Sequence, residues 1–371
     1  MKDLKRHQIR QAIIVAAMDD QTNDSAAVES FTLHIPQGDI DDLKQRIAQT
    51  RWADKEVTDG SFQGTPLSMA QKTTKIDNLS IHFFHIRPKE PNAKAILLTH
   101  GWPGSFVEFL KCIPLLIDPA SNGGRSGEAF HVIIPSLPGW GFTEQPKEIG
   151  WNMEHTAKAL VTLMEQRLGY EKWFAQGGDY GAAITTLMAQ MRPKGLVAIH
   201  LNLLLAIPKT LENPTDEESR ALEAFHITQN EMSGWKWISS TRPQTIAYLL
   251  SDSSVGQAMW IYDKYQDWTD NSGDPVDALT LDEMLDYQRS LVFTKCWFHI
   301  KNTLNFDFGP VEMPVAILVF EKDIFKHPKK WSEKGYPNMI HFHTVDKGKH
   351  FGAFERPEIL VKDIRLGFAN M

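Results

Sequence analysis

Short apolar runs recur along the chain and alternate with stretches of helical periodicity. Continuous apolar runs, as opposed to alternating ones, are typical of strands that are buried on both faces of a parallel sheet. Because helical patterns separate the runs, the sequence predicts an α/β fold with a mostly parallel central sheet that is covered by helices. Six such runs lie at residues 95–99, 132–135, 173–175, 196–201, 315–320 and 340–343.

The amino-terminal part of the chain has a different pattern. Residues 31–36 alternate as in a strand, and residues 39–52 have helical periodicity. Two further runs, 74–76 and 79–86, flank Asp77-Asn78, a dipeptide that favours a hairpin turn. This part predicts a segment with strands and a helix that packs on the core.

The regular alternation stops between residues 202 and 308. This stretch has helical patterns, as at 244–250 and 281–293, and it is rich in tryptophan. A long helical insertion between two core strands predicts a cap over the carboxyl ends of the sheet, where ligands bind in open α/β folds. The expected parts are an N-terminal extension (1–30), an N-terminal segment (31–92), a first part of the core (93–201), the helical cap (202–308) and a second part of the core (309–371).

Composition and charge narrow the class of protein. Of the 371 residues, 42% are hydrophobic and 23% charged, as in globular proteins, and the formal net charge of −7 leaves no basic excess to bind nucleic acid. With only two cysteines, Cys112 and Cys296, we expect no disulfide framework and a cytoplasmic location. No cluster of cysteine and histidine has the spacing of a metal site, so neither a metal nor another cofactor is expected.

The first residues combine several basic side chains with an apolar run at residues 12–18. This pattern resembles a signal peptide, but the run is short and no clear cleavage site follows it, so a docking helix is favoured. Membrane association is left open. Residues 19–30 are polar and predict a mobile link.

The first candidate catalytic motif is Gly177-Gly178-Asp179-Tyr180-Gly181, which lies between an apolar run and a helical pattern. A strand, a tight glycine-flanked turn and a helix make the layout of a nucleophile elbow, with Asp179 at the nucleophile position. Gly177 and Gly181 fit this turn, because a Cβ at either place would meet the neighbouring strand or helix. The alternative interpretation is an ordinary helix start with Asp179 as its N-cap.

Three further stretches fit an elbow. The loop at residues 100–105 follows a strand and would supply one backbone N–H of an oxyanion hole, from Trp102, while Tyr180 would supply the other. His350 follows the last predicted strand and can act as a base. Glu321 and Asp323 follow the strand before it, and either can orient that histidine. The order nucleophile, acid, base is that of an α/β-hydrolase.

An aspartate nucleophile narrows the reaction further. A carboxylate attacks saturated carbon without a base to activate it, which forms an alkyl ester on Asp179. Water activated by His350 would then hydrolyse that ester. Such an elbow suits epoxides or alkyl halides, whereas a serine would suit esters or amides.

These residues resemble the microsomal-type epoxide hydrolases of the α/β-hydrolase superfamily, over most of the chain from about residue 30. The likeness rests on the His-Gly-Trp-Pro-Gly-Ser loop at 100–105, the Gly-Gly-Asp elbow and the Gly-x-His-Phe-x-Ala-x-Glu-x-Pro stretch at 348–357. It implies that Asp179 is the nucleophile and His350 the base. It also implies Asp323 as the acid, because Pro328 and Trp331 complete the family's pattern after it.

The chain departs from the family at several positions. Two cap tyrosines hold and protonate the epoxide oxygen in the family, but Trp235 stands at the first position and Leu304 or a neighbour at the second. Tyr180 replaces the usual tryptophan, and the segment between residues 67 and 76 is shorter. Candidate replacements for the missing donors are Tyr248, Tyr287 and His299, of which Tyr287 and His299 are expected with Trp235 in the substrate pocket.

The sequence thus predicts a hydrolase that opens a small apolar epoxide to a vicinal diol, with a detoxifying role. A haloalkane or haloacid dehalogenase is the alternative within the fold, because halide needs N–H donors but no proton. A catalytically impaired hydrolase that binds a hydrophobic ligand is the alternative outside enzymes. A homodimer is left open.

Overall fold

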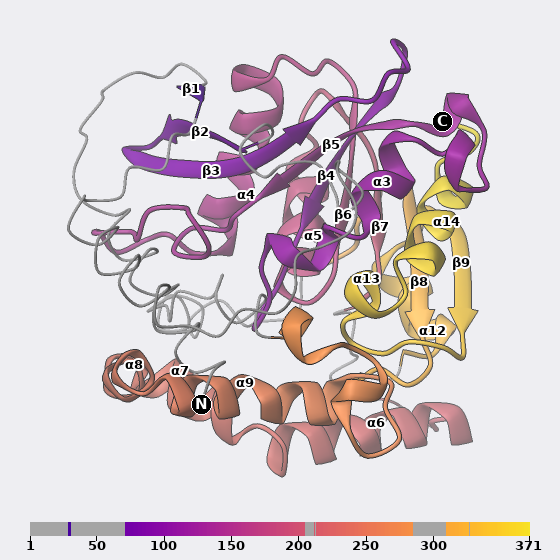
Figure 1. The fold of residues 1–371 in the computed structure, drawn as a ribbon. Helices are drawn as coiled ribbons and strands as arrows, with labels where there is room; N and C mark the ends of the chain where they lie inside the picture. Colours follow the sequence, from indigo (N-terminus) through magenta and orange to yellow (C-terminus); the bar gives the residue numbers. More distant parts are fainter. Residues whose placement is uncertain (1–28, 31–70, 205–210, 212, 285–308, 326) are drawn as a thin grey trace, which may run out of the picture.

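The computed structural model describes residues 29–30, 71–204, 211, 213–284, 309–325 and 327–371. Within these residues a single nine-stranded sheet has the order β1-β2-β3-β5-β4-β6-β7-β8-β9 (Figure 1). All pairs from β5 to β9 are parallel, whereas β1, β2 and β3 pair antiparallel. The strands are β1 (Glu29–Ser30), β2 (Gln71–Ile76), β3 (Leu79–Ile86), β4 (Lys94–Thr99), β5 (Phe130–Pro135), β6 (Trp173–Gly177), β7 (Leu196–Leu201), β8 (Val315–Phe320) and β9 (Met339–Val345).

Each of the six predicted core strands is present, but β9 is an edge strand whose side chains are half-buried or exposed, so the prediction of burial on both faces is wrong for residues 340–343. Consecutive side chains are buried along β4, β5 and β6, which confirms that both faces of the sheet are covered. Helix α3 (Cys112–Ile117) packs with α14 (Pro357–Gly367), and α4 (Met153–Thr162) packs with α5 (Tyr180–Met191) (Figure 1). The predicted α/β fold with a mostly parallel sheet is therefore confirmed.

The predicted hairpin at Asp77-Asn78 is also present. The two residues have φ of 48° and 62°, the left-handed conformation that a two-residue type I′ turn requires, and Ile76 pairs with Leu79 across it. Its second strand, β3, pairs with β5, so residues 71–86 extend the central sheet instead of packing on it as a separate segment. Residues 29 and 30 pair with β2, so the polar link predicted over residues 19–30 is wrong at its end.

The cap begins as predicted with a series of helices between β7 and β8. These are α6 (Asp216–Asn230), α7 (Gly234–Thr241), α8 (Pro243–Asp252) and α9 (Ser254–Trp268). They lie beyond the carboxyl ends of β8 and β9 (Figure 1). Helix α6 starts at a capping box, in which Thr215 and Glu218 each accept a backbone N–H of the other.

Some predicted elements fall outside the described residues. These are the strand at 31–36, the helix at 39–52, most of the helix at 281–293 and the apolar run at 12–18. The domain boundaries in those regions stay predictions. The remaining described elements are short: η2 (Phe106–Phe109), η3 (Ala120–Asn122), η4 (Ser126–Glu128), η5 (Leu163–Arg167), η6 (Pro275–Asp277), α12 (Lys329–Gly335) and α13 (Gly352–Glu355).

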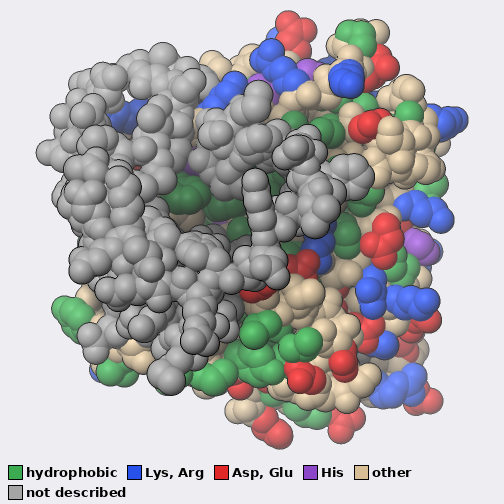
Figure 2. Space-filling view, viewed as in Figure 1, with side chains coloured by type: hydrophobic (Ala, Val, Ile, Leu, Met, Phe, Trp, Pro, Cys, Tyr) green, Lys and Arg blue, Asp and Glu red, His purple; other side chains and the backbone are tan. Residues whose placement is uncertain are grey.

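The described surface mixes both signs of charge. In Figure 2, Lys and Arg side chains lie interspersed with Asp and Glu on the described part of the visible face. Among the helices that the structure describes, none is long and apolar enough to cross a membrane.

Candidate active site

Asp179 lies in the turn between β6 and α5, with φ of 49° and ψ of −125°. This conformation is strained for a residue with a side chain and costs on the order of 1–3 kcal/mol. A Cβ on Gly177 would overlap the backbone of Gly181, and one on Gly181 would overlap the backbone of Thr99, so the turn depends on both glycines. Asp179 stands at the N-cap position of α5, but its side chain makes no capping hydrogen bond, and the strand, strained turn and helix have the layout predicted for a nucleophile elbow.

His350 lies between two carboxylates. Its Nδ1 is 3.0 Å from Oδ1 of Asp323, and its Nε2 is 3.5 Å from Oδ2 of Asp179. Asp323 follows β8 and His350 follows β9, so the two loops meet at the carboxyl edge of the sheet beside the elbow. Asp323 is 5% exposed, whereas Glu321 faces solvent. Of the two acids that the sequence left open, the structure brings Asp323 to the histidine.

The charge of His350 depends on both neighbours. Burial alone would lower the pKa of its imidazole, but the carboxylates of Asp323 and Asp179 raise that pKa to about 10. The imidazole is therefore protonated at neutral pH. Loss of the negative charge on Asp179 would remove one of the two stabilising partners.

The predicted oxyanion loop contacts the nucleophile directly. The backbone N–H of Trp102 donates to Oδ1 of Asp179 over 2.6 Å. Gly101 has no room for a side chain, because its Cβ would overlap the Asp179 carboxylate. Tyr180, the second expected donor, is the first residue of α5, where backbone N–H groups form the positive end of the helix dipole.

His100 holds this loop in place. The N–H of Leu137 donates to Nε2 of His100 over 3.1 Å, so the imidazole proton is on Nδ1, which lies 3.2 Å from the carbonyl of Gly101. Burial lowers the pKa of His100 to about 4, so the ring is neutral at physiological pH. A neutral ring with one donor and one acceptor satisfies both contacts and fixes the loop beside Asp179.

An apolar pocket leads to Asp179. Apolar side chains from the core and the cap form most of its wall. Its polar groups include Lys236 and Gln229, which are hydrogen-bonded to each other over 2.7 Å. A mostly apolar wall with a few polar groups is typical of sites that bind small organic molecules.

Three tryptophans pack together beside the triad, and two of them, Trp235 and Trp268, line the pocket. Trp235, at the position where the family has a tyrosine, lies parallel to Trp102 with ring centroids 3.9 Å apart. Trp268 meets Trp235 edge to face at 5.3 Å and His350 at 5.0 Å. The predicted pocket residue Trp235 therefore lines the pocket, but its ring stacks on the oxyanion loop.

The other predicted cap donors have different outcomes. Tyr248 is 69% exposed on α8 and does not line this pocket. Tyr287, His299 and Leu304 lie outside the described residues.

Sequence reasoning missed a polar junction between the cap and the two catalytic loops. Asp270, just after α9, accepts from Lys322 over 2.7 Å and from the N–H of Gly348 over 2.9 Å. The N–H of His350 donates to the carbonyl of Trp268 over 3.1 Å. Glu355 accepts the N–H of Asp270 over 2.7 Å. The end of α9 thus holds the loops that carry Asp323 and His350.

Glu355 should make the stability of the protein depend on pH. Burial, with a further contribution from the charge of Asp270, raises the pKa of its carboxyl from 4.5 to about 7. The folded state therefore binds more protons than the unfolded state between these values, so stability falls as pH rises through this window. Between pH 5 and 8 this loss should amount to about 2–3 kcal/mol.

The Glu355→Gln variant isolates this effect, because glutamine keeps an acceptor for the Asp270 N–H but does not ionise. The free energy of unfolding, measured by chemical denaturation at pH 5 and 8, should fall less in the variant than in the wild type. Equal losses in the two proteins would contradict the assignment.

The comparisons with known proteins agree with this site. A model of the alpha/beta hydrolase fold matches residues 94–232, and a model of the epoxide hydrolase N terminus matches residues 68–109. Among solved structures, juvenile hormone epoxide hydrolase from Bombyx mori is similar with a TM-score of 0.75 and 25% identity, over 93% of this chain and 95% of that one. The epoxide hydrolase of Aspergillus niger has a TM-score of 0.72 and 27% identity, over 96% and 97%. The fold and the elbow define an α/β-hydrolase.

Two relatives in sequence make the assignment more specific. The "Putative epoxide hydrolase" of Stigmatella aurantiaca is 43% identical, over 93% of this chain and 85% of its own length. Epoxide hydrolase 1 of Sus scrofa is 34% identical, over 79% and 72%. The chain belongs to the epoxide hydrolases of the microsomal type, as its motifs predicted.

Proposed function

We propose that this epoxide hydrolase works through an ester on Asp179 that a water activated by His350 then cleaves. The observation that carries the proposal is the placement of the Asp179 carboxylate. One oxygen accepts the N–H of Trp102 at 2.6 Å, and the other faces His350 at 3.5 Å, at the base of an apolar pocket. A carboxylate held in this way can attack an epoxide carbon and later present its carbonyl to the oxyanion loop.

In the first step, the oxygen of Asp179 that is not held by Trp102 forms a bond to an epoxide carbon. The carbon–oxygen bond of the ring breaks, and its electron pair goes to the epoxide oxygen. That oxygen needs a proton donor or a close positive charge. Lys236 lines the same pocket, and burial lowers the pKa of its ammonium group, which makes it a stronger acid.

We assign Lys236 as the donor among the described residues. The indole N–H of Trp235 can donate a hydrogen bond but is too weak an acid to give up its proton. If Lys236 has this role, Lys236→Met should form the ester more slowly, as measured by mass spectrometry of the protein. An unchanged rate would exclude Lys236.

The second step, hydrolysis of the ester, depends on the loss of the negative charge on Asp179. Esterification makes Asp179 neutral, which removes one of the two carboxylates that raise the pKa of His350. The imidazolium then releases its proton to solvent, from which the amine of Lys236 recovers the proton that it gave to the epoxide oxygen. The neutral ring, still oriented by Asp323, becomes a base. Water loses a proton to Nε2 and attacks the carbonyl carbon of the ester. The negative oxygen that forms lies at the N–H of Trp102. When the intermediate collapses, Nε2 returns the proton to the leaving oxygen, and the diol departs with the original Asp179 oxygen; the carboxyl proton of Asp179 then passes to His350.

A second, smaller cavity provides a place for that water. It reaches Asp179 and is lined by His350, Asn202 and Glu108 among other residues. It has room for about one water, and these polar groups supply hydrogen-bond partners. We assign it to the hydrolytic water, which would keep the water separate from the apolar substrate pocket.

The wall of the large pocket supports a small apolar epoxide as the substrate class. Haloalkane dehalogenation is the alternative chemistry for the same nucleophile, because the three indole rings near the pocket carry N–H groups that can bind halide. Styrene oxide and 1-bromobutane therefore serve as the two probe substrates.

A single turnover in heavy-oxygen water tests the proposal. With styrene oxide as the substrate, we expect the heavy oxygen in the peptide that carries Asp179, because water attacks the carbonyl carbon of the ester. Label only in the diol would show direct attack of water on the epoxide and overturn the covalent route. Turnover of 1-bromobutane but not of styrene oxide would favour the dehalogenase.

We also propose a cytoplasmic location. Cys112 is a free, buried thiol, which is consistent with a reducing compartment. Fractionation of cells that produce the protein at native levels tests this, and recovery in the membrane or outside the cell would contradict it.

A further inference from the structure

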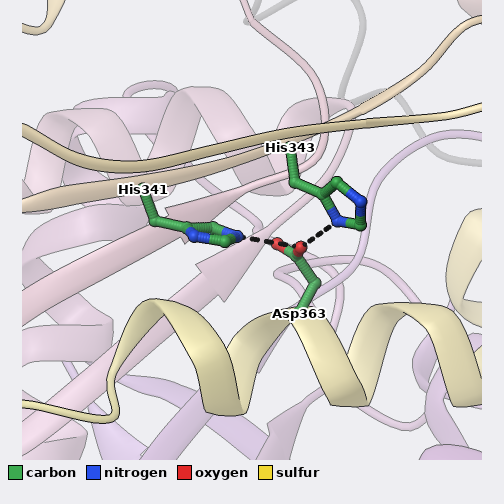
Figure 3. Close-up of side chains that lie close together, drawn as sticks. All are labelled: His341, His343 and Asp363. Atoms are coloured by element: carbon green, nitrogen blue, oxygen red, sulfur yellow. Dashed lines mark hydrogen bonds and ion pairs between the residues drawn. The ribbon is translucent and has the colours of Figure 1, made fainter.

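A second cluster of polar side chains lies at the far edge of the sheet. His341 and His343 are two residues apart on the edge strand β9, so their side chains point to the same face. Asp363 lies on α14, which packs against that face, and its carboxylate meets both imidazoles (Figure 3). None of these residues takes part in the proposed reaction.

The distances show that three ligand-type atoms converge. Nε2 of His341 is 3.0 Å from Oδ2 of Asp363, and Nδ1 of His343 is 2.7 Å from the same oxygen. All three atoms lie within 4.8 Å of one another. In a tetrahedral zinc site with bonds of about 2.0–2.1 Å, neighbouring ligand atoms are roughly 3.3–3.4 Å apart. To admit an ion, the two imidazole–carboxylate distances would lengthen by about 0.3–0.7 Å, and the two imidazole nitrogens would take a similar spacing of roughly 3.3–3.4 Å.

A buried histidine orients the carboxylate. His200 on β7 is 0% exposed, and its Nε2 lies 3.0 Å from Oδ1 of Asp363, the oxygen that faces away from His341 and His343. A hydrogen bond to the other oxygen of a ligating carboxylate is what the outer partners of metal sites supply. Gly367, one turn after Asp363, lets α14 approach the sheet closely, because a Cβ there would meet Ala316.

The exposure of the cluster gives an ion a path to it. The side chain of His343 is 47% exposed and that of His341 is 23% exposed, whereas Asp363 is 1% exposed. A buried anion with two partly exposed imidazoles on its solvent side leaves room for a water as the fourth ligand.

We propose that His341, His343 and Asp363 form a binding site for a divalent transition-metal ion, with zinc as the best match. Two imidazole nitrogens and one carboxylate oxygen are ligands that suit zinc, whereas magnesium and calcium require mostly oxygen ligands. The lone pairs of Nε2 of His341 and Nδ1 of His343 bind the ion, so in each neutral ring the proton lies on the other nitrogen.

The position of the site gives the ion a structural role. Strand β9 precedes the loop that carries His350, and α14 follows it. An ion held by both elements would fasten the two sides of that loop to each other. Binding to the folded state alone raises stability, so zinc should increase the melting temperature of the protein.

Calorimetric titration of tag-free, chelator-treated protein with zinc chloride tests the site. We expect one zinc ion per chain in the wild type. His343→Gln removes a ligand that is half exposed, so the variant should fold, and it should bind zinc more weakly by at least the roughly 10- to 100-fold that loss of an outer partner costs. Cobalt in place of zinc should give the visible absorption of tetrahedral coordination in the wild type but not in His343→Gln.

The matched control is His155→Gln. His155 also pairs with a carboxylate, that of Asp77, over 2.8 Å, but no second histidine joins the pair in the described structure. This variant should bind zinc as the wild type does. A zinc ion bound at the catalytic triad instead would bind equally to the wild type, His343→Gln and His155→Gln. Equal binding by wild type and His343→Gln, or no binding by the wild type, would overturn the proposal.

Discussion

His350→Gln should open an epoxide once and then stop, with the substrate attached to Asp179. Attack by a carboxylate on carbon needs no base, whereas hydrolysis of the ester needs His350 to activate water. Steady-state formation of diol should fall by about 10²- to 10⁴-fold, the contribution of a positioned base. Mass spectrometry after incubation with styrene oxide should show protein plus one substrate, and peptide mapping should place the adduct on Asp179.

Two further variants, each combined with His350→Gln, test which groups are needed to form the adduct. Asp179→Asn in the same background should give no adduct, because an amide does not replace the carboxylate as nucleophile. Lys236→Met in the same background should slow the adduct if Lys236 supplies the proton. An adduct that appears equally fast without Lys236 would transfer that role to another group, such as Tyr287 or His299. If neither epoxides nor halides give an adduct, the chain would instead be a binding protein.

Asp323→Asn should reduce turnover by up to about 10⁴-fold, the loss seen when the orienting acid of a catalytic triad is neutralised. Asp323 lies 3.0 Å from Nδ1 of His350 and is one cause of the raised pKa of that imidazole. Asparagine retains the shape but not the charge, so the histidine would be a weaker base and would lose its preferred tautomer. The rate of diol formation at saturating styrene oxide measures the effect.

Glu321→Gln is the matched control. Glu321 lies two residues away on the same loop and also loses one charge, but its side chain faces solvent. Its turnover should stay within a few-fold of the wild type. A larger loss from Glu321→Gln than from Asp323→Asn would reverse the assignment of the acid.

The sheet and the elbow could be predicted because local rules decide them. Apolar runs that are continuous become strands buried on both faces, and the strained turn at Asp179 leaves room only for glycine at positions 177 and 181. The hairpin at Asp77-Asn78 follows from the left-handed preference of those two residues. The pairing of β1 with β2 could not be predicted, because its two polar residues show no alternation of apolar and polar positions. Their strand conformation depends on the neighbouring strand.

The contacts around the site depended on residues far apart in sequence. Asp270 is in the cap, yet it binds Lys322 and Gly348, and no local pattern marks it. The cluster at β9 was missed for the same reason, since its carboxylate, Asp363, comes from a helix 20 residues after His343. Trp235 lines the pocket that reaches Asp179, but its stacking on Trp102 could not be predicted from the sequence.

The junction at the end of α9 has a consequence for engineering. Caps are natural units to exchange between related hydrolases when a new substrate range is wanted. In this chain, however, Asp267 and Asp270 of the cap bind Lys349, Lys322 and the Gly348 backbone, which belong to the catalytic loops. A chimera that imports a foreign cap should therefore retain or transplant both sides of this junction together, so that selectivity can be altered while the catalytic histidine stays in register.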